Sequence, residues 1–234
     1  MTPPIDDPEA LREILATTDA LLLDFDGPVC SLFAGLPAHV VADQLRQVLA
    51  AGGHSKLPLD VEQATDPFVV LFHAAALGEE EVRYVDAAFR ALEADAVRSA
   101  KPTAGSHDLL RGWKLTDRPL AIVSNNSVAA IAAYLDFYDL RSATDVIAAR
   151  ANADSALLKP NPHLVDKAIT MLKVQPARCT LVGDSPTDIQ AARAAHARSV
   201  GYANKPGKTE ALSNAQPTAI TTTMMLLTGA FRGD

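Results

Sequence analysis

The sequence of 234 residues has few of the features that mark secreted, membrane-spanning or nucleic-acid-binding proteins. Its two cysteines, Cys30 and Cys179, are too few for a disulfide framework or a cysteine-based zinc site. Acidic residues outnumber basic ones by 28 to 21, and no basic stripe is present to neutralise the phosphates of a nucleic acid. No apolar run approaches the roughly 20 residues that a membrane-spanning helix needs. We therefore expect neither a nucleic acid nor a membrane as a partner.

The overall composition is that of an ordinary globular protein. Hydrophobic residues make up 48% of the chain and charged residues 21%, which rules out wholesale disorder. The length suits one large α/β domain, or a core with a smaller insertion. Residues 1–10 are acidic and Pro-rich and lack the apolar segment of a secretory signal. We expect a cytoplasmic protein that is a monomer or a homodimer.

Short apolar runs alternate with longer Ala-rich stretches along most of the chain. Such runs suit parallel strands that helices bury on both faces, and the stretches between them have helical periodicity. Repeated right-handed βαβ crossovers build a doubly wound, mostly parallel sheet, whose ligand lies beyond the carboxyl ends of the strands. The predicted strands are 20–24, 120–124, 145–148, 180–184 and 198–202, and the predicted helices between them are 126–136, 162–173 and 186–196.

Residues 31–99 interrupt this alternation with helical patterns and no convincing strand. Helical periodicity covers 37–50 and 79–98, and we assign the apolar segment 68–77 to a helix because its neighbours are helical. The turn formers in 100–105 predict a linker that returns the chain to the core. The predicted domains are an α/β core of residues 1–30 and 100–234 and an inserted α-helical cap of residues 31–99.

The first predicted strand ends in two carboxylates, Asp24 and Asp26, followed by Gly27. Alternation along an extended chain places both carboxylates on one side of the strand. Two carboxylates so close together are costly unless a cation or a proton separates them. The pattern suits a divalent-metal site with one carboxylate as nucleophile and the other as acid/base. A pair of solvated aspartates that cap a turn is the alternative.

Three further motifs follow predicted strands or extended segments. Asp184 ends a strand and Asp188 lies at the start of the next helix, where an acidic residue is also an ordinary helix cap. Ser124 and Asn125 follow another strand and offer a hydroxyl, an amide and free N–H groups to an anion. Lys159 lies before the first of two prolines in an extended segment. Each of these motifs alone is weak evidence for a site.

Together, and in this order, the four motifs resemble the pattern of the haloacid dehalogenase-like hydrolase superfamily. The resemblance covers residues of about 20–30 and 100–207, and segments such as LAIVSNNS and LVGDSPTDIQAARAA have the texture of this family. The helical insertion after the first motif resembles the C1-type cap of members that act on small soluble substrates. The resemblance thus implies the same doubly wound core and inserted cap.

The resemblance also implies a role for each acidic residue. Asp24 would attack the phosphorus of the substrate and form an aspartyl-phosphate. Asp26 would protonate the leaving alkoxide and then deprotonate the water that hydrolyses the intermediate. Mg²⁺ would be held by the carboxylate of Asp24, the backbone carbonyl of Asp26 and Asp184. Asp188 would support the waters of the metal or orient Lys159.

The remaining site residues would bind the phosphoryl group. Ser124, Lys159 and backbone N–H groups around Gly27 and Asn125 would hold its oxygens where charge collects in the transition state. Pro28 departs from the family pattern, since Thr or Val is usual there, and it removes one backbone donor near the phosphate.

A second departure is His196, which stands where a glycine usually ends the helix and which we expect in a left-handed turn. Cys30 is expected to be a small buried side chain. Asn204 and Lys205 lie either at the rim of the site or in a plain surface turn.

The sequence therefore predicts an Mg²⁺-dependent phosphatase that acts on a small phosphorylated metabolite. A phosphomutase of the same fold would share every core residue but needs a base in the cap. A dehalogenase is disfavoured because Asp26 supplies an acid that cleavage of a carbon–halogen bond does not need. A catalytically weak protein that binds a phosphoryl group or a protein partner is the third alternative, and Pro28 is the only feature in its favour.

Overall fold

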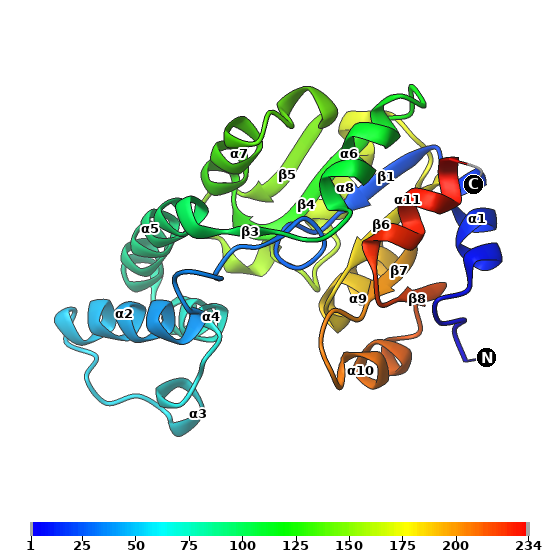
Figure 1. The fold of residues 1–234 in the computed structure, drawn as a ribbon. Coiled ribbons are helices and arrows are strands. Elements are labelled where there is room, and N and C mark those ends of the chain that lie inside the picture. Colours follow the sequence, from blue (N-terminus) through cyan, green and yellow to red (C-terminus); the bar gives the residue numbers. More distant parts are fainter. Residues whose placement is uncertain (1, 233–234) are drawn as a thin grey trace.

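A computed structural model describes residues 2–232, so the outermost residues of the predicted core, 1 and 233–234, lie outside the described residues. A six-stranded parallel sheet forms the centre of the molecule, with the strand order β5-β4-β1-β6-β7-β8 (Figure 1). The predicted α/β fold with a parallel sheet is confirmed. The strands are β1 (Ala20–Leu23), β4 (Leu120–Ser127), β5 (Val146–Arg150), β6 (Cys179–Gly183), β7 (Arg198–Tyr202) and β8 (Ala219–Thr221).

The central strand β1 is buried on both faces, as its continuous apolar run predicts. Leu21 and Leu23 pack into one hydrophobic cluster, while Ala20 and Leu22 belong to a second cluster on the opposite face. The first cluster includes α1 (Pro8–Ala16), α6 (Ser106–Lys114), α7 (Val128–Phe137) and α11 (Met224–Arg232). The second includes α8 (His163–Leu172) and α9 (Pro186–Ala194), and α10 (Lys208–Ala215) packs beside α9.

The three predicted core helices are present with bounds that differ by one or two residues. Helix α9 starts at Pro186 after the N-cap Ser185, and it ends at Ala194, two residues before the predicted end. His196 follows with a φ of 58°, which is the left-handed turn expected of it. Helices α1, α6, α10 and α11 and the short strand β8 are additions to the sequence prediction.

Residues 31–99, the segment predicted to be helical, contain four α-helices. They are α2 (Ala38–Ala51), α3 (Leu59–Glu62), α4 (Pro67–Leu77) and α5 (Glu79–Ala96), and they form the lower left part of Figure 1. The assignment of 68–77 to a helix is confirmed. Short 3₁₀ helices complete the chain: η1 (Val97–Ser99), η2 (Arg141–Ala143), η3 (Ser155–Leu157) and η4 (Pro176–Arg178).

The segment 100–105, predicted to be a plain linker, instead contributes a strand. β2 (Cys30–Ser31) pairs antiparallel with β3 (Lys101–Pro102), so the two chain segments that enter and leave the helical insertion form a small ribbon. Thr103 ties this ribbon to the loop after β1, because its Oγ1 donates to the carbonyl of Gly27 at 2.6 Å. The entry to the insertion is thus fixed directly beside the end of β1.

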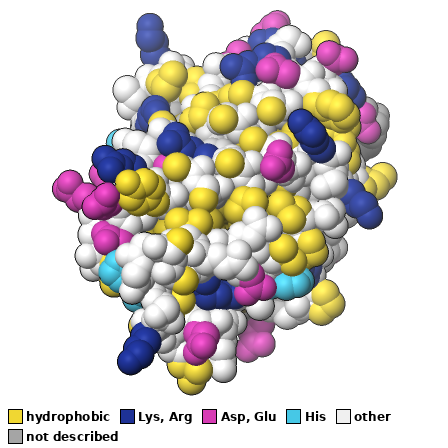
Figure 2. Space-filling model, turned by 90° about the vertical axis from the view of Figure 1, so that its left-hand side faces the viewer, with side chains coloured by type: hydrophobic (Ala, Val, Ile, Leu, Met, Phe, Trp, Pro, Cys, Tyr) yellow, Lys and Arg dark blue, Asp and Glu magenta, His cyan; other side chains and the backbone are white. Residues whose placement is uncertain are grey.

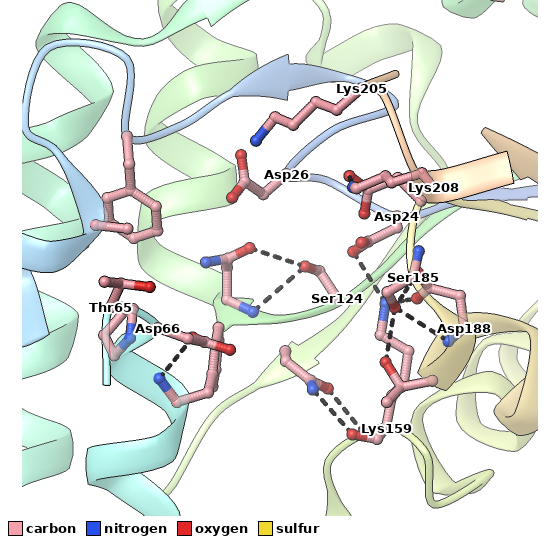
Figure 3. Close-up of a pocket in the computed structure, with 18 of the residues that line it drawn as sticks. Asp24, Asp26, Thr65, Asp66, Ser124, Lys159, Ser185, Asp188, Lys205 and Lys208 are labelled. Atoms are coloured by element: carbon pink, nitrogen blue, oxygen red, sulfur yellow. Dashed lines mark hydrogen bonds and ion pairs between the residues drawn. The ribbon is translucent and has the colours of Figure 1, made fainter. Parts of the chain in front are cut away.

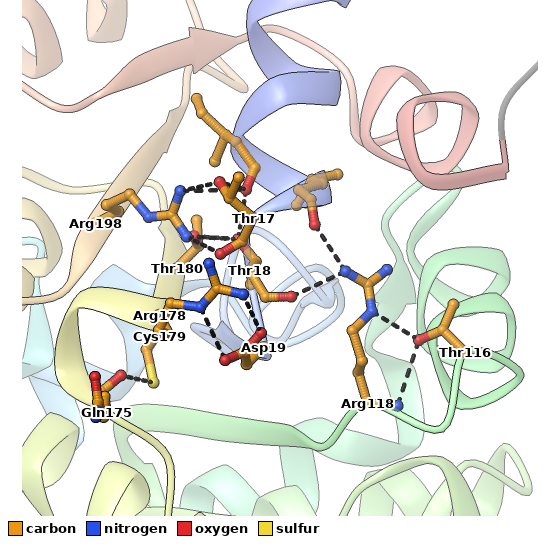
Figure 4. A network of polar contacts seen from close by, with 12 residues as sticks. Thr17, Thr18, Asp19, Thr116, Arg118, Gln175, Arg178, Cys179, Thr180 and Arg198 are labelled. Atoms are coloured by element: carbon orange, nitrogen blue, oxygen red, sulfur yellow. Dashed lines mark hydrogen bonds and ion pairs between the residues drawn. The ribbon is translucent and has the colours of Figure 1, made fainter.

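The amino ends of the strands carry three arginines, Arg118, Arg178 and Arg198 (Figure 4). Asp24 and Asp184 lie at the opposite, carboxyl ends of the strands. Arg118 donates to the carbonyls of Leu15 and Thr18 at 2.7 and 2.9 Å, and Arg198 donates to the carbonyl of Thr17 at 2.7 Å. These carbonyls lie at the carboxyl end of α1, where positive charge stabilises a helix. This cluster holds α1 on the sheet.

The outer face of the helical insertion mixes hydrophobic and charged side chains, as Figure 2 shows for the side around α2 and α5. A shallow groove between these helices is lined by Val40, Val48 and Leu92 among others. Among residues 2–232, no helix is both long enough and apolar enough to cross a membrane.

Candidate active site

Loops at the carboxyl ends of β1, β4, β5 and β6 meet the helical insertion around a pocket of about 420 Å³ (Figure 3). Convergence at this edge follows from the parallel sheet, in which every strand delivers its carboxyl end to the same side. The pocket brings together all the site residues predicted from the sequence except Gly27, which lies just behind it. Those that line it are Asp24, Asp26, Ser124, Asn125, Lys159, Asp184 and Asp188.

Asp24 directly follows β1 and is only 8% exposed. Its Oδ1 accepts a hydrogen bond from the N–H of Phe25 at 2.7 Å and lies 2.9 Å from Nζ of Lys159. Burial raises the pKa of Asp24 to about 7; the charges of Asp188 and Asp184 act in the same direction, and Lys159 opposes them. A nearby divalent cation would favour the ionised form of this carboxyl group.

Asp26 lies two residues further along the same loop. Its Oδ1 accepts a hydrogen bond from the N–H of Leu32 at 2.8 Å, which fixes the carboxyl group against the start of the insertion. Burial raises the pKa of Asp26 to about 6, although this hydrogen bond acts in the opposite direction. A carboxyl group with that pKa can donate or accept a proton near neutral pH.

Gly27 allows this loop to pass close to the β6 loop. Its φ is 112°, and a Cβ atom there would lie 2.4 Å from Oδ2 of Asp184. Its N–H donates to the carbonyl of Cys30 at 2.7 Å and its carbonyl accepts from Thr103, so the backbone of Gly27 serves the turn. The prediction that Gly27 binds substrate stays a prediction. Cys30 is fully buried, as expected.

The β6 loop supplies the other two carboxylates. Ser185 and Asp188 form a reciprocal capping box at the start of α9, and Asp188 also contacts Nζ of Lys159. Carboxylate oxygens of Asp24, Asp184 and Asp188 all lie within 4.8 Å of one another. Hard oxygen donors at this density fit a divalent cation such as Mg²⁺. Both oxygens of Asp188 are engaged, Oδ1 by Lys159 and Oδ2 by Ser185. The contacts of Asp24 and Asp184 each involve one oxygen, so these two carboxylates are better placed to hold the ion.

Lys159 enters the pocket from the segment after β5 and is only 3% exposed. Its Nζ donates to the carbonyl of Val123 at 3.0 Å and contacts both Asp24 and Asp188. Burial alone would lower the pKa of Lys159, but the two carboxylates raise it above its ordinary value. Lys159 is therefore a permanent positive charge beside Asp24.

The β4 loop lies next to Lys159. Ser124 Oγ lies 3.1 Å from Oδ1 of Asn126, and both residues are buried at the pocket wall. The side-chain amide of Asn125 exchanges two hydrogen bonds with the backbone of Lys159, at 2.8 and 3.1 Å. Asn125 thus holds Lys159 in place, and its predicted contact with substrate rests on its position in the pocket wall.

Sequence reasoning missed two groups of pocket residues, of which Lys208 is the first, and it left open whether Asn204 and Lys205 lie at the rim of the site or in a surface turn. Lys208, the first residue of α10, contacts Asp184, and Asn204 donates to the same carboxylate at 3.1 Å. The NKPGK segment after β7 was the available signal, and it places Asn204 and Lys205 at the site rather than in a remote surface turn. The second group comes from the helical insertion and includes Phe33, Thr65, Asp66, Phe68 and Phe72.

Comparisons with known proteins agree with this geometry. The model of the haloacid dehalogenase-like hydrolases matches residues 18–196. A search of curated proteins found no match. A predicted phosphatase from Clostridium acetobutylicum is 18% identical, with a TM-score of 0.71 over 92% of this chain and 98% of that chain. At this low identity, the structural similarity shows that the two chains share a fold.

Two other solved structures are similar in the same sense. A hydrolase of the family from Deinococcus radiodurans, determined with bound phosphate and sodium, is 24% identical over 93% of this chain and 96% of that chain, with a TM-score of 0.61. A predicted phosphoglycolate phosphatase from Haemophilus somnus is 17% identical over 89% of this chain and 95% of that chain, with a TM-score of 0.64.

Proposed function

The chain belongs to the haloacid dehalogenase-like hydrolases, and on that premise we propose that it is an Mg²⁺-dependent phosphatase of a small phosphorylated metabolite. One observation carries the proposal: Asp24 and Asp26 line one pocket, with a buried lysine 2.9 Å from Asp24 and a second acidic loop beside it. A carboxylate nucleophile, an acid/base and fixed positive charge are the parts that phosphoryl transfer through a covalent intermediate requires.

In the first step, a carboxylate oxygen of Asp24 attacks the phosphorus and the bond to the leaving alkoxide breaks. The alkoxide takes its proton from the carboxyl group of Asp26, and Asp24 becomes an aspartyl-phosphate. In the second step, the ionised Asp26 takes a proton from a water molecule, which attacks the same phosphorus. Inorganic phosphate leaves, and Asp24 and the protonated Asp26 are restored.

The pKa of Asp26 suits both of these steps. At about 6, it leaves a useful fraction of the group protonated near neutral pH, and the ionised form remains a competent base. The hydrogen bond from Leu32 keeps one oxygen occupied, so the other oxygen exchanges the proton.

Asp24, Asp184 and the backbone carbonyl of Asp26 would hold the metal ion. Mg²⁺ bound there would screen the carboxylates from one another and neutralise charge on the phosphoryl oxygens. Asp188 would act mainly on Lys159, with which it forms a buried ion pair. Lys208 lines the same pocket, contacts Asp184 and would tune the charge of that ligand.

The phosphoryl group would lie between Lys159 and the β4 loop. Ser124 and Lys159 line the pocket together with Asp24, and both carry hydrogen-bond donors. Such preorganised donors stabilise the charge that collects on the transferring group. The phosphate bound in the Deinococcus radiodurans structure supports a phosphorylated substrate for this fold.

Residues 31–99 would act as a cap over the alcohol part of the substrate. Phe33, Phe68 and Phe72 line the pocket from this segment, and Phe72 is 41% exposed. A cap that excludes bulk water protects the aspartyl-phosphate until the second step.

The test is release of inorganic phosphate from a panel of phosphate monoesters: sugar phosphates, phosphorylated organic acids and nucleotides. Mg²⁺-dependent release from at least one ester supports the proposal, and the preferred ester identifies the substrate class. No release from any ester above the rate of a denatured control would contradict it. Transfer to a second hydroxyl of the same compound, without net release, would identify a phosphomutase instead.

A further inference from the structure

A cluster of buried charges next to the pocket has no part in the steps described above. Arg150, the last residue of β5, is 2% exposed, and Asp86 and Glu93 of α5 are 1% and 0% exposed. Arg150 contacts Asp86 through Nη1 and lies 2.7 Å from Oε2 of Glu93 through Nη2. Arg90 lies 3.1 Å from Asp86 and balances the charge. The cluster joins the inserted helix α5 to the edge of the sheet.

Arg150 and Glu93 also form hydrogen bonds with the loop at the end of β4. Arg150 donates from Nε to the carbonyl of Asn125 at 2.9 Å. Glu93 accepts hydrogen bonds from the side-chain amide of Asn126 at 2.9 Å and from the N–H of Ser127 at 3.1 Å. The guanidinium of Arg150 also lies 4.6 Å from the ring centre of Phe89, so a planar, delocalised cation fits this place better than an ammonium.

The loop held in this way leads directly to the nucleophile. Asn125 holds the backbone of Lys159 with its two side-chain hydrogen bonds, and Lys159 lies 2.9 Å from Asp24. A continuous chain of contacts thus runs from Arg150 through Asn125 and Lys159 to Asp24. Each link is buried or half-buried, where polar contacts are strong and misplacement is costly.

We propose that Arg150 is a positioning residue of the phosphatase site, which uses the acidic face of α5 as its anchor and fixes Lys159 through Asn125. The inference rests on the proposed function. It also fixes α5 against the edge strand β5, because its carboxylates cannot leave Arg150 without leaving a buried charge unpaired. Any opening of the cap would then involve α2 to α4.

Arg150→Lys tests the inference because it keeps the charge and removes the planar fork with its several donors. The matched control is Arg118→Lys. Arg118 lies at the amino ends of the strands, far from the pocket, and also donates to backbone carbonyls. Both variants should lower the melting temperature. Only Arg150→Lys should lower kcat, by about 10- to 100-fold, and weaken the binding of inorganic phosphate measured by titration calorimetry with Mg²⁺ present.

A double-mutant cycle with Asn125→Ala separates positioning from general destabilisation. If Arg150 acts through Asn125, adding Arg150→Lys to the Asn125→Ala variant should lower kcat by less than about threefold. The full loss in that background would overturn the inference. If Arg150→Lys does not fold, Glu93→Gln takes its place, because it weakens the ion pair with Arg150 and the hydrogen bonds to the β4 loop. It should then lower kcat and phosphate affinity in the same way.

Unchanged kcat and phosphate affinity in every folded variant would also overturn the inference. If the wild-type protein releases phosphate from no ester, the proposed phosphatase function fails. The calorimetric comparison still decides whether Arg150 shapes the anion site.

Discussion

At the scale of single residues, burial works against the charges that the proposed chemistry needs. Asp24, Asp26 and Asp184 all have a pKa above the ordinary value of an aspartate, and burial is the largest cause in each case. Lys159 and Lys208 offset part of this cost. A site of this kind is poised for metal binding and proton transfer, and it lowers the stability of the metal-free protein.

Asp26→Asn should stabilise the metal-free protein and abolish turnover. The folded pKa of about 6 exceeds the ordinary value of 3.8, so between these pH values the folded state binds more protons. The contribution of Asp26 to stability is therefore complete below pH 3.8 and is lost as the pH rises through about 6. The loss amounts to roughly 3 kcal/mol, which the amide avoids because it does not ionise.

Urea unfolding from pH 4 to pH 7 with chelator present measures this effect. The free energy of unfolding should fall more steeply with pH in the wild type than in Asp26→Asn. Parallel curves for the two proteins would show that Asp26 titrates as an ordinary exposed aspartate. Asp136→Asn, on the surface helix α7, is a suitable control that should leave the slope unchanged.

Sequence patterns identified the residues that end strands, because a parallel sheet gathers those ends at one edge. Asp24, Ser124 and Asp184 were placed together on that ground, and the family pattern added Asp188 and Lys159. Arg150, Glu93 and Lys208 gave no such signal. Their contacts depend on the reach of long side chains between elements far apart in the sequence, which no spacing rule describes.

At the scale of elements, the tight turn after β1 joins the two acidic loops. Gly27→Ala should disrupt this turn in two ways, since its φ of 112° disfavours a side chain and the new Cβ would clash with Asp184. Gly53 is a matched control, because its φ is 95° but nothing lies within 4 Å of a Cβ there. Both variants should lose about 1 kcal/mol of stability from backbone strain.

Only Gly27→Ala should also bind Mg²⁺ more weakly and turn over more slowly. Titration with Mg²⁺ measures the first effect, and the rate of phosphate release measures the second. Equal Mg²⁺ affinity in both glycine variants would mean that the contact between Gly27 and Asp184 has no role in the metal site.

The elements themselves were predictable where a segment carries its own pattern. Strands β1, β4, β5, β6 and β7 contain short apolar runs, and α2 and α5 have helical periodicity. The segment of α4 is apolar throughout, and only its helical neighbours indicated a helix. β2, β3 and β8 contain only two or three residues each, too few for a period, and their hydrogen bonds come from partners distant in the sequence. The β-bridge between Ile5 and Ile220 was unpredictable for the same reason, because it joins the start of the chain to a residue distant in the sequence.

At the scale of the whole molecule, a metal ion held between the β1 and β6 loops should stabilise the entire fold. A ligand at 100 times its dissociation constant adds about 2.7 kcal/mol to the free energy of unfolding, which corresponds to roughly 5 to 10 °C in a chain of this size. Mg²⁺ should therefore raise the melting temperature and restore activity after chelation. Ca²⁺, which prefers higher coordination numbers, should support activity poorly.

Asp184→Asn should reduce the effect of Mg²⁺ on the melting temperature, whereas Asp145→Asn, at the opposite edge of the sheet, should not. Full activity of the wild type in excess chelator would contradict a metal-dependent mechanism.

The central claim is that Asp24 carries the phosphoryl group between the two steps. The most direct measurement is acid quenching of the enzyme during turnover of a ³²P-labelled ester, followed by peptide mapping. We predict label on the peptide that contains Asp24, removed by hydroxylamine as an acyl phosphate is, and absent from the Asp24→Asn variant. Rapid release of phosphate from the wild type with an unlabelled chain, or the same turnover in Asp24→Asn, would contradict the account.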